Sequence, residues 1–157
     1  MDWNELATVC FDSIIPHTRH HVVGNHQFQV IQLAMQEARK LGYTESIMGR
    51  RRYLPDLNSD NRQLRDMAER MALNAPIQGS AADIIKLAMI SVNDMLKEGN
   101  YKSKMLLQVH DELVFDVHNS ELEKIQPMIK HEMENAFKMI VPLDVEVGTG
   151  ENCLEAH

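Results

Sequence analysis

The sequence predicts an α+β fold in which helices pack on a small antiparallel sheet. Two segments with helical spacing of apolar residues, 28–41 and 60–99, come first along the chain. Residues 105–147 then follow the order strand, strand, helix, strand. The two strands are separated by a very short turn. Helices followed by a hairpin, a helix and a last strand are typical of an α+β layer with antiparallel pairing.

Length and composition indicate one ordinary globular domain. The chain has 157 residues, of which 44% are hydrophobic and 25% are charged. No apolar run approaches the ~18 residues that a membrane span needs, so we expect no membrane association. Cys10 and Cys153 stand at opposite ends, which suits a reducing compartment, and we expect a cytoplasmic protein. Nothing in the composition predicts the oligomeric state.

The charge distribution is uneven. The net charge of −7 argues weakly against a nucleic-acid partner, but residues 111–157 carry −8 and residues 1–110 carry +1. Arginine forms planar, bidentate contacts with phosphate or carboxylate. The alternative is a solvated helix face paired with nearby acids, and charge alone leaves both interpretations open. Six arginines crowd the stretch 50–70: Arg50, Arg51, Arg52, Arg62, Arg65 and Arg70.

The first half is predicted to contain a loose segment, a helix and a hairpin. Residues 1–27 hold four histidines but no spacing of a recognisable metal site, so we expect a loose terminal segment there. A helix is predicted over 28–41 and ends at Gly42. Residues 43–57 form two short strands around Met48-Gly49-Arg50, and Pro55 ends the second.

The next helix is predicted to begin at a cap, either Asp60 or Asn61. Arg70 and Asn74 lie four residues apart beside its apolar face, and Gln78 extends their row. Pro76 predicts a kink or break, because proline lacks an N–H group. Ser80-x-x-Asp83 resembles a capping box, which would restart the helix up to Gly99.

The last third is predicted to contain strands over 105–109 and 113–117. Ser120-x-x-Glu123 is a second capping box, and it opens a helix that runs to Pro142. Pro127 lies inside this helix, which predicts a kink or a later start. Leu143, Val145 and Val147 alternate as a last strand, closed by Gly148.

The stretch QVHDELVFD, residues 108–116, is the strongest functional signal. It places His110 and Asp111 at a tight turn, where positive φ favours Asn-Gly or Asp-Gly, so the residue choice opposes the turn geometry. Such local conflicts are expected at functional sites. Asp111 and Glu112 are adjacent carboxylates, which repel unless a cation intervenes. Mg²⁺ is a suitable cation, while the alternative is an exposed turn with ordinary acids.

Three stretches resemble the family A DNA polymerases, the bacterial DNA polymerase I family. QVHDELVFD looks like the third active-site motif of that family. GRRRYLPDLNS and AERMALNAPIQGSAADIIKLAM resemble the segment that leads into it. The end, ENCLEAH, resembles the family's C-terminus, although Cys153 stands where Trp is usual. The resemblance runs from about Gln29 to His157, so we expect residues 28–157 to be a C-terminal palm portion and residues 1–27 to lie outside it.

The resemblance implies a role for each matching residue. It implies that Asp111 binds Mg²⁺ as the catalytic carboxylate, with Glu112 as its accessory acid and metal neighbour. It implies that His110 touches the primer terminus. Primer–template DNA is the implied partner, and dNTP is the substrate of the complete enzyme, in DNA replication and repair. Contacts with template and primer near the nascent pair are implied for Arg70, Asn74 and Gln78.

The family's first motif, which supplies another metal-binding aspartate, and its fingers helix are not recognisable in this sequence. We therefore expect a fragment that adds few or no nucleotides by itself. Three alternatives are a catalytically silent DNA-binding module, a phosphohydrolase that uses His110 and Asp111 as metal ligands, and a structural protein whose eleven methionines only pack.

Overall fold

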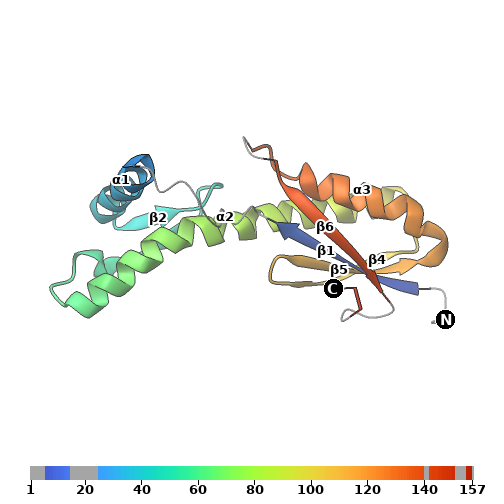
Figure 1. The fold of residues 1–157 in the computed structure, drawn as a ribbon, viewed down its shortest axis with the longest axis horizontal. Helices are drawn as coiled ribbons and strands as arrows, with labels where there is room; N and C mark the ends of the chain where they lie inside the picture. Colours follow the sequence, from blue (N-terminus) through green and yellow to red (C-terminus); the bar gives the residue numbers. More distant parts are fainter. Residues whose placement is uncertain (1–5, 15–24, 140–141, 151–154, 157) are drawn as a thin grey trace. The chain divides into compact units, whose positions relative to one another are not determined.

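The computed structural model describes residues 6–14, 25–139, 142–150 and 155–156. The predicted α+β class is confirmed (Figure 1). The chain divides into two compact units, one formed by Met1–His17 with Ile84–His157 and the other by Thr18–Asp83. The division lies inside one helix. None of the described helices is long and apolar enough to cross a membrane.

The unit Thr18–Asp83 begins with helix α1, Asn25–Leu41, which starts three residues before the predicted position. Gly42 ends it as predicted. The backbone of Gly42 has φ +76°, and its N–H donates to the Ala38 carbonyl at 2.8 Å. Glycine adopts this left-handed conformation without the steric cost that a Cβ brings, and it is therefore a common helix stop.

The predicted hairpin is confirmed. Strands β2, Tyr43–Glu45, and β3, Arg51–Tyr53, pair antiparallel. Gly49 has φ +77° in the turn, and its N–H donates to the Ser46 carbonyl at 2.9 Å. The short 3₁₀ helix η2, Pro55–Asn58, starts at Pro55, which ends the strand region as predicted.

Helix α2, Arg62–Glu98, is capped as expected and continues through the proline. The Asn61 Oδ1 accepts a hydrogen bond from the Gln63 N–H at 2.9 Å. A break at Pro76, one of the two predicted alternatives, is wrong, while a kink there stays a prediction. Ser80 does not restart the helix: its hydroxyl donates to the Pro76 carbonyl at 2.6 Å and accepts from the Ile47 N–H at 2.8 Å. The Ser80 hydroxyl thus joins α2 to the hairpin turn close to the proline.

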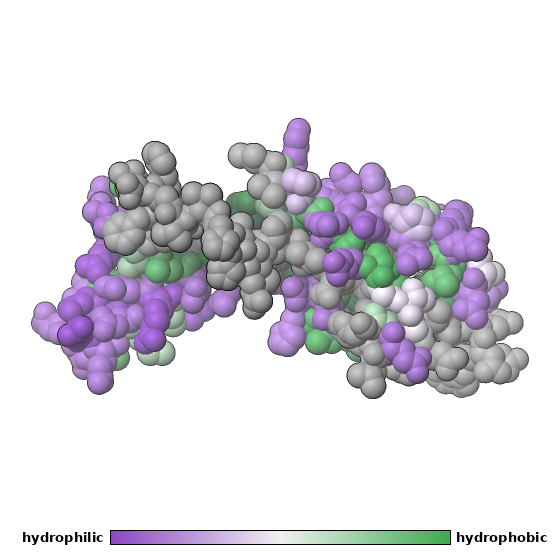
Figure 2. Space-filling view, viewed as in Figure 1, coloured by the Kyte–Doolittle hydropathy of each residue, from purple (hydrophilic) through white to green (hydrophobic). Residues whose placement is uncertain are grey.

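The core of this unit joins both helices with η2. The exposed fraction of Leu57 is 1% and that of Ala68 is 2%. Hydrophilic residues gather over the first turns of α2 (Figure 2). The buried core residues are Ala38, Leu54, Leu57, Ala68 and Ala72.

The other unit is built on a four-stranded antiparallel sheet in the order β4-β5-β1-β6. Its strands are β1, Leu6–Ile14; β4, Lys104–Val109; β5, Glu112–His118; and β6, Asp144–Gly150. The two predicted strands of the hairpin and the last strand are confirmed. The expectation of a loose segment is wrong for residues 6–14, because β1 lies inside the sheet between β5 and β6.

Helix α3, Leu122–Glu134, follows β5 through the 3₁₀ helix η3, Asn119–Glu121. The predicted helix is confirmed, but its second capping box is wrong. Ser120 lies inside η3, where its N–H donates to the Nδ1 of His118. The helix starts before Pro127, so the later start is wrong, while the alternative of a kink stays a prediction. The helix ends at Glu134, with Asn135 as its cap, rather than at Pro142.

One core joins the sheet, α3 and the part of α2 from Ile84 onward. Val9, Phe115 and Ile125 are fully buried in it. Hydrophilic residues cover most of the visible outer face of α3 (Figure 2). The buried members are Val9, Ile85, Ala88, Val92, Leu96, Leu113, Phe115, Val117, Ile125, Ile129, Met133 and Val145.

The described end of the chain lies against β6. A Cβ built on Gly148 would come within 1.6 Å of the Ala156 carbonyl oxygen, and one built on Gly150 would come within 2.7 Å of the Glu155 Cβ. Gly148 was expected to close the strand, but β6 continues to Gly150. These glycines are present because the chain end passes too close for a side chain.

Candidate functional site

The β4–β5 hairpin turns at His110 and Asp111, as the sequence predicts. Val109 and Glu112 are paired in register, which leaves a two-residue loop. The φ of His110 is +55°, and its carbonyl accepts a hydrogen bond from the Gln108 Nε2 at 2.7 Å. Positive φ is uncommon for a residue with a Cβ, although His adopts it more often than most. The turn therefore carries the local cost that the sequence predicted.

The two adjacent acids project from a buried base. Asp111 is exposed and Glu112 is half-buried, whereas Leu113 and Phe115, further along β5, have exposed fractions of 0%. Asp111 and Glu112 each take part in interactions within the protein. The buried part of β5 therefore holds in place the backbone from which both carboxylates extend.

Strand β1 adds a residue that the sequence interpretation missed. Asp12 lies directly opposite Glu112 on β5 and opposite Glu146 on β6. Residues that bear carboxylates therefore occupy matching positions on three adjacent strands. The apolar residues before Asp12, ending in Val9-Cys10-Phe11, are a signal for a buried strand that could have led to it.

Oxygen ligands at the hairpin tip suit a hard cation. Mg²⁺ needs only one or two protein carboxylates and completes its shell with water and substrate phosphate. Asp111 and Glu112 satisfy that requirement by residue type. Among the side chains that the structure describes, no three of the His, Cys, Asp and Glu type gather around one point that could hold a metal ion. By residue type, Asp111 and Glu112 fit an ion that completes its shell with water and substrate phosphate.

The α2 residues that the sequence places in one row lie together. Arg70, Asn74 and Gln78 line a cavity of about 350 Å³. Arg52 from β3 reaches the same cavity, so the hairpin closes one side of it. The roles of these three residues in DNA contact stay predictions. The remaining lining residues are Met67, Met71 and Ala75.

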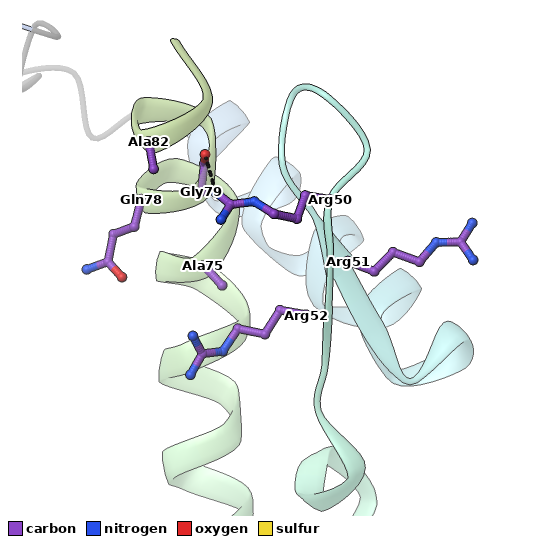
Figure 3. Close-up of a pocket in the computed structure, with 7 residues that line it drawn as sticks. All are labelled: Arg50, Arg51, Arg52, Ala75, Gln78, Gly79 and Ala82. Atoms are coloured by element: carbon purple, nitrogen blue, oxygen red, sulfur yellow. Dashed lines mark hydrogen bonds between the residues drawn. The ribbon is translucent and has the colours of Figure 1, made fainter. Parts of the chain in front are cut away.

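A second cavity, of about 340 Å³, adjoins the first and shares Arg52, Ala75 and Gln78 with it. Arg50 and Arg51 also line it (Figure 3). The side chains of Arg50 and Arg52 extend toward α2, while that of Arg51 points away from it. The arginine-rich stretch therefore brings two guanidinium groups against a helix that carries Gln78.

The other arginines are partly paired, as the alternative interpretation of a solvated face requires. The Nε of Arg51 lies 2.7 Å from the Glu45 carboxylate, and its guanidinium lies 4.6 Å from the centre of the Tyr43 ring. The hydrogen bond to Glu45, followed by the Tyr43 charge, raises the pKa of Arg51. Arg62 pairs with Asp66 at 3.7 Å, and Arg65 donates to the Ser59 carbonyl at 3.0 Å.

The structure thus groups the predicted site residues in two sets. His110, Asp111 and Glu112 form the hairpin tip in one unit. Arg70, Asn74 and Gln78 form the α2 row in the other. Each set has the internal arrangement that the sequence predicts.

Known proteins are similar to this chain in sequence and fold. The model of the family "DNA polymerase family A" matches residues 25–155. DNA polymerase I of Mycobacterium leprae is 58% identical over 118 residues, which cover 75% of this chain and 13% of the relative. The thermostable DNA polymerase I of Thermus thermophilus is 48% identical over 126 residues, 80% of this chain and 15% of the relative. The chain therefore spans about one seventh of the length of these relatives.

A solved structure agrees with the family model and with the two relatives. The POL domain of Pol1 from M. smegmatis, in complex with DNA primer-template and dNTP, superposes with a TM-score of 0.79 and 50% identity. The match covers 82% of this chain and 23% of that domain. The family match spans both the α2 row and the hairpin tip, and the predicted resemblance is confirmed. The chain belongs to DNA polymerase family A.

Proposed function

We propose that this chain is the C-terminal palm portion of a cytoplasmic DNA-directed DNA polymerase that acts in replication and repair. It binds primer–template DNA and supplies carboxylates for Mg²⁺-dependent nucleotidyl transfer from dNTP. The observation that carries this proposal is the β4–β5 turn, where Asp111 and Glu112 follow a positive-φ His110 in a segment that matches the family. The solved relative that contains primer-template and dNTP supports the choice of partners.

Asp111 and Glu112 are the residues that would hold Mg²⁺. When bound, the ion neutralises phosphate charge and orients the reacting oxygens. The hairpin keeps both carboxylates on one rigid turn, so little reorganisation is needed to present them. His110, which shares this turn, is placed to contact the primer terminus beside the carboxylates.

The α2 row is proposed to contact the nascent base pair. Arg70, Asn74 and Gln78 line one cavity, and each side chain has N–H donors. The minor groove offers the acceptors A N3 and T O2 in either orientation of the pair. Donors of this kind check the shape of a pair without selecting its sequence, as a polymerase requires.

We propose that the chain alone adds few or no nucleotides. The sequence contains no recognisable fingers helix over the incoming nucleotide and no recognisable first motif. Asp12 lies opposite Glu112 in the ladder. Partial metal binding with little catalysis is therefore the expected behaviour.

The test separates metal binding from catalysis. Mn²⁺ is titrated into the chain and followed by electron paramagnetic resonance, with Asp111→Asn as the variant and the exposed Glu123→Gln on α3 as the control. We expect Asp111→Asn to weaken Mn²⁺ binding at least tenfold, whereas Glu123→Gln leaves it unchanged. Equal binding of Mn²⁺ by both variants would overturn the metal role.

Primer extension with dNTP and Mg²⁺ measures activity, and robust product dependent on Asp111 would contradict the proposed inactivity.

A DNA-binding module without metal chemistry is the second candidate, because the α2 row and its arginines need no metal. It predicts salt-sensitive binding to primer–template and no Mn²⁺ binding that depends on Asp111. The phosphohydrolase is disfavoured, since His110 and Asp111 lie at a strand turn and not on the helices that such a site requires.

A further inference from the structure

The contact between the β2–β3 turn and α2 includes a carboxylate that the proposed function leaves unused. Asp83 of α2 is 8% exposed, and its Oδ1 lies 3.0 Å from the Nη2 of Arg50. Its Oδ2 is buried and has no hydrogen-bond partner among the residues that the structure describes. A buried carboxylate is unfavourable unless it is paired, so Asp83 depends on Arg50.

Arg50 is held from two directions. Its Nη2 also donates to the Gly79 carbonyl at 2.9 Å (Figure 3). Both contacts use Nη2, so neither engages the N–H groups on Nη1 and Nε. About half of the Arg50 side chain is exposed, at 51%. The guanidinium is therefore anchored at one nitrogen while its other donors stay available for a ligand.

The backbone around Arg50 is fixed as well. The Arg50 N–H donates to the Ser46 hydroxyl at 3.1 Å, and the Ile47 N–H donates to the Ser80 hydroxyl at 2.8 Å. A Cβ built on Gly79 would come within 3.1 Å of the Ser46 Cβ, so glycine permits the close approach. These contacts hold the turn against α2 and so restrict the position of the Arg50 backbone.

The anchored guanidinium faces a ligand-sized space. Arg50, Arg52 and Gln78 line the cavity of about 340 Å³. That volume equals about ten water molecules, enough for a phosphodiester group. Two guanidinium groups with planar donor edges suit a phosphate better than a neutral ligand. Gln78 joins this cavity to the α2 row, so the phosphate of a bound nucleic-acid strand is the favoured occupant.

We propose that Asp83 is a positioning residue, which holds Arg50 so that Arg50 and Arg52 bind a backbone phosphate of the DNA strand beside the α2 row. The inference rests on the proposed function, because it takes DNA as the ligand. Asp83 acts only through Arg50 and does not touch the DNA. This arrangement explains why an acid is buried next to a surface that binds a polyanion.

The test uses the whole chain and a fluorescent primer–template duplex, with affinity measured by anisotropy over a salt series. Loss of one phosphate contact lowers the slope of log K against log salt by about 0.9. Arg50→Gln is expected to show that loss. Arg62→Gln removes the same charge from an exposed side chain that pairs with Asp66 and lines neither cavity, and it is expected to keep the wild-type slope.

Asp83→Asn separates positioning from general electrostatics. The substitution makes the protein more positive, so charge alone predicts tighter binding. The positioning role predicts weaker binding, by about two- to tenfold, because Arg50 loses its charged anchor. Binding that is unchanged or tighter in Asp83→Asn would overturn the proposal, as would equal slopes for Arg50→Gln and Arg62→Gln.

Two further readouts keep the outcome clear. Arg50→Gln leaves Asp83 unpaired, so the double variant Arg50→Gln/Asp83→Asn provides a second measurement if the single variant fails to fold. The double variant is expected to bind no more weakly than Arg50→Gln alone, since Asp83 acts through Arg50. A larger loss of DNA affinity in the double variant would contradict the inference that Asp83 acts only through Arg50. A wild-type chain that binds no duplex at all would overturn the proposed function together with this inference.

Discussion

Asp12 of β1 and Glu112 of β5 are directly opposite each other in the antiparallel ladder, and Glu146 of β6 is opposite Asp12 on the other side. Like charges at opposing positions destabilise a sheet by up to about 1 kcal/mol per pair. If the proposed Mg²⁺ site includes this acidic register, a bound cation is expected to offset the repulsion.

The first prediction follows from this pair. Without metal, Asp12→Asn is expected to raise the unfolding temperature by about 2–4 °C, because the two like-charge pairs that Asp12 forms with Glu112 and Glu146 are removed. With saturating Mn²⁺, the wild-type chain gains stability and Asp12→Asn gains less. Thermal unfolding with and without Mn²⁺ measures both effects. Equal stabilisation of the two proteins by Mn²⁺ would show that Asp12 has no part in binding.

The second prediction concerns Glu121 and pH. Burial raises the pKa of the Glu121 carboxyl, but hydrogen bonds from the Ser103 hydroxyl and from the N–H groups of Lys102 and Ser103 outweigh burial, and the pKa is held below its ordinary 4.5. The lowered folded-state pKa means that this stability is present above pH 4.5 and is lost as the pH falls through the folded value.

Glu121→Gln is therefore expected to lower the free energy of unfolding by about 1 kcal/mol at pH 7, a value limited by solvent screening. The difference from the wild type should vanish in acid. Urea unfolding at a series of pH values measures it, with Glu123→Gln on the next turn as the control. A difference in the free energy of unfolding that stays constant down to pH 2 would contradict the stabilising role assigned to the Glu121 carboxylate.

The third prediction concerns the strained turn. His110→Gly is expected to stabilise the fold by about 0.5–1 kcal/mol, since glycine has no Cβ to oppose φ +55°. His110→Val is expected to destabilise it, because a β-branched side chain opposes that conformation most. Chemical unfolding of the two variants gives the comparison. Primer–template binding should fall in both, and unchanged binding would argue against the primer contact of His110.

The fourth prediction concerns the chain end. Gly148→Ala places a methyl group where the Ala156 carbonyl lies, so the end segment must leave β6 or the strand must shift. We expect a loss of about 1–3 kcal/mol in the free energy of unfolding and faster proteolysis near residue 156. Thr149→Ser, a neighbouring change on the same strand, serves as the control. Normal stability and unchanged proteolysis would show that the end does not pack as described.

Local sequence signals predicted the elements that local interactions hold. Gly42 stops α1 through its own φ, Asn61 caps α2 through the Gln63 N–H, and His110 with Asp111 occupies the hairpin turn. Each of these rests on residues within a few positions of one another. The α2 row was predictable for the same reason, because helical spacing alone aligns Arg70, Asn74 and Gln78.

The features that the sequence interpretation missed depend on contacts between residues that are far apart in the sequence. β1 is a strand because β5 and β6, far along the chain, pair with both of its edges. Pro76 remains inside α2, where Ser80 contacts Ile47 and Arg50 pairs with Asp83. Ser80 and Ser120 both precede an acid at capping-box spacing, yet each hydrogen bonds elsewhere. Sequence spacing carries no information on such partners.

The central place of β1 has a consequence for the order in which the protein assembles during synthesis. β1 is made before α1 and α2, but its partners β5 and β6 leave the ribosome only after roughly a hundred further residues. At about 5–20 residues per second, the unpaired strand waits on the order of ten seconds. High contact order of this kind slows folding. The nascent chain therefore holds β1 without its sheet partners until β5 and β6 have been made.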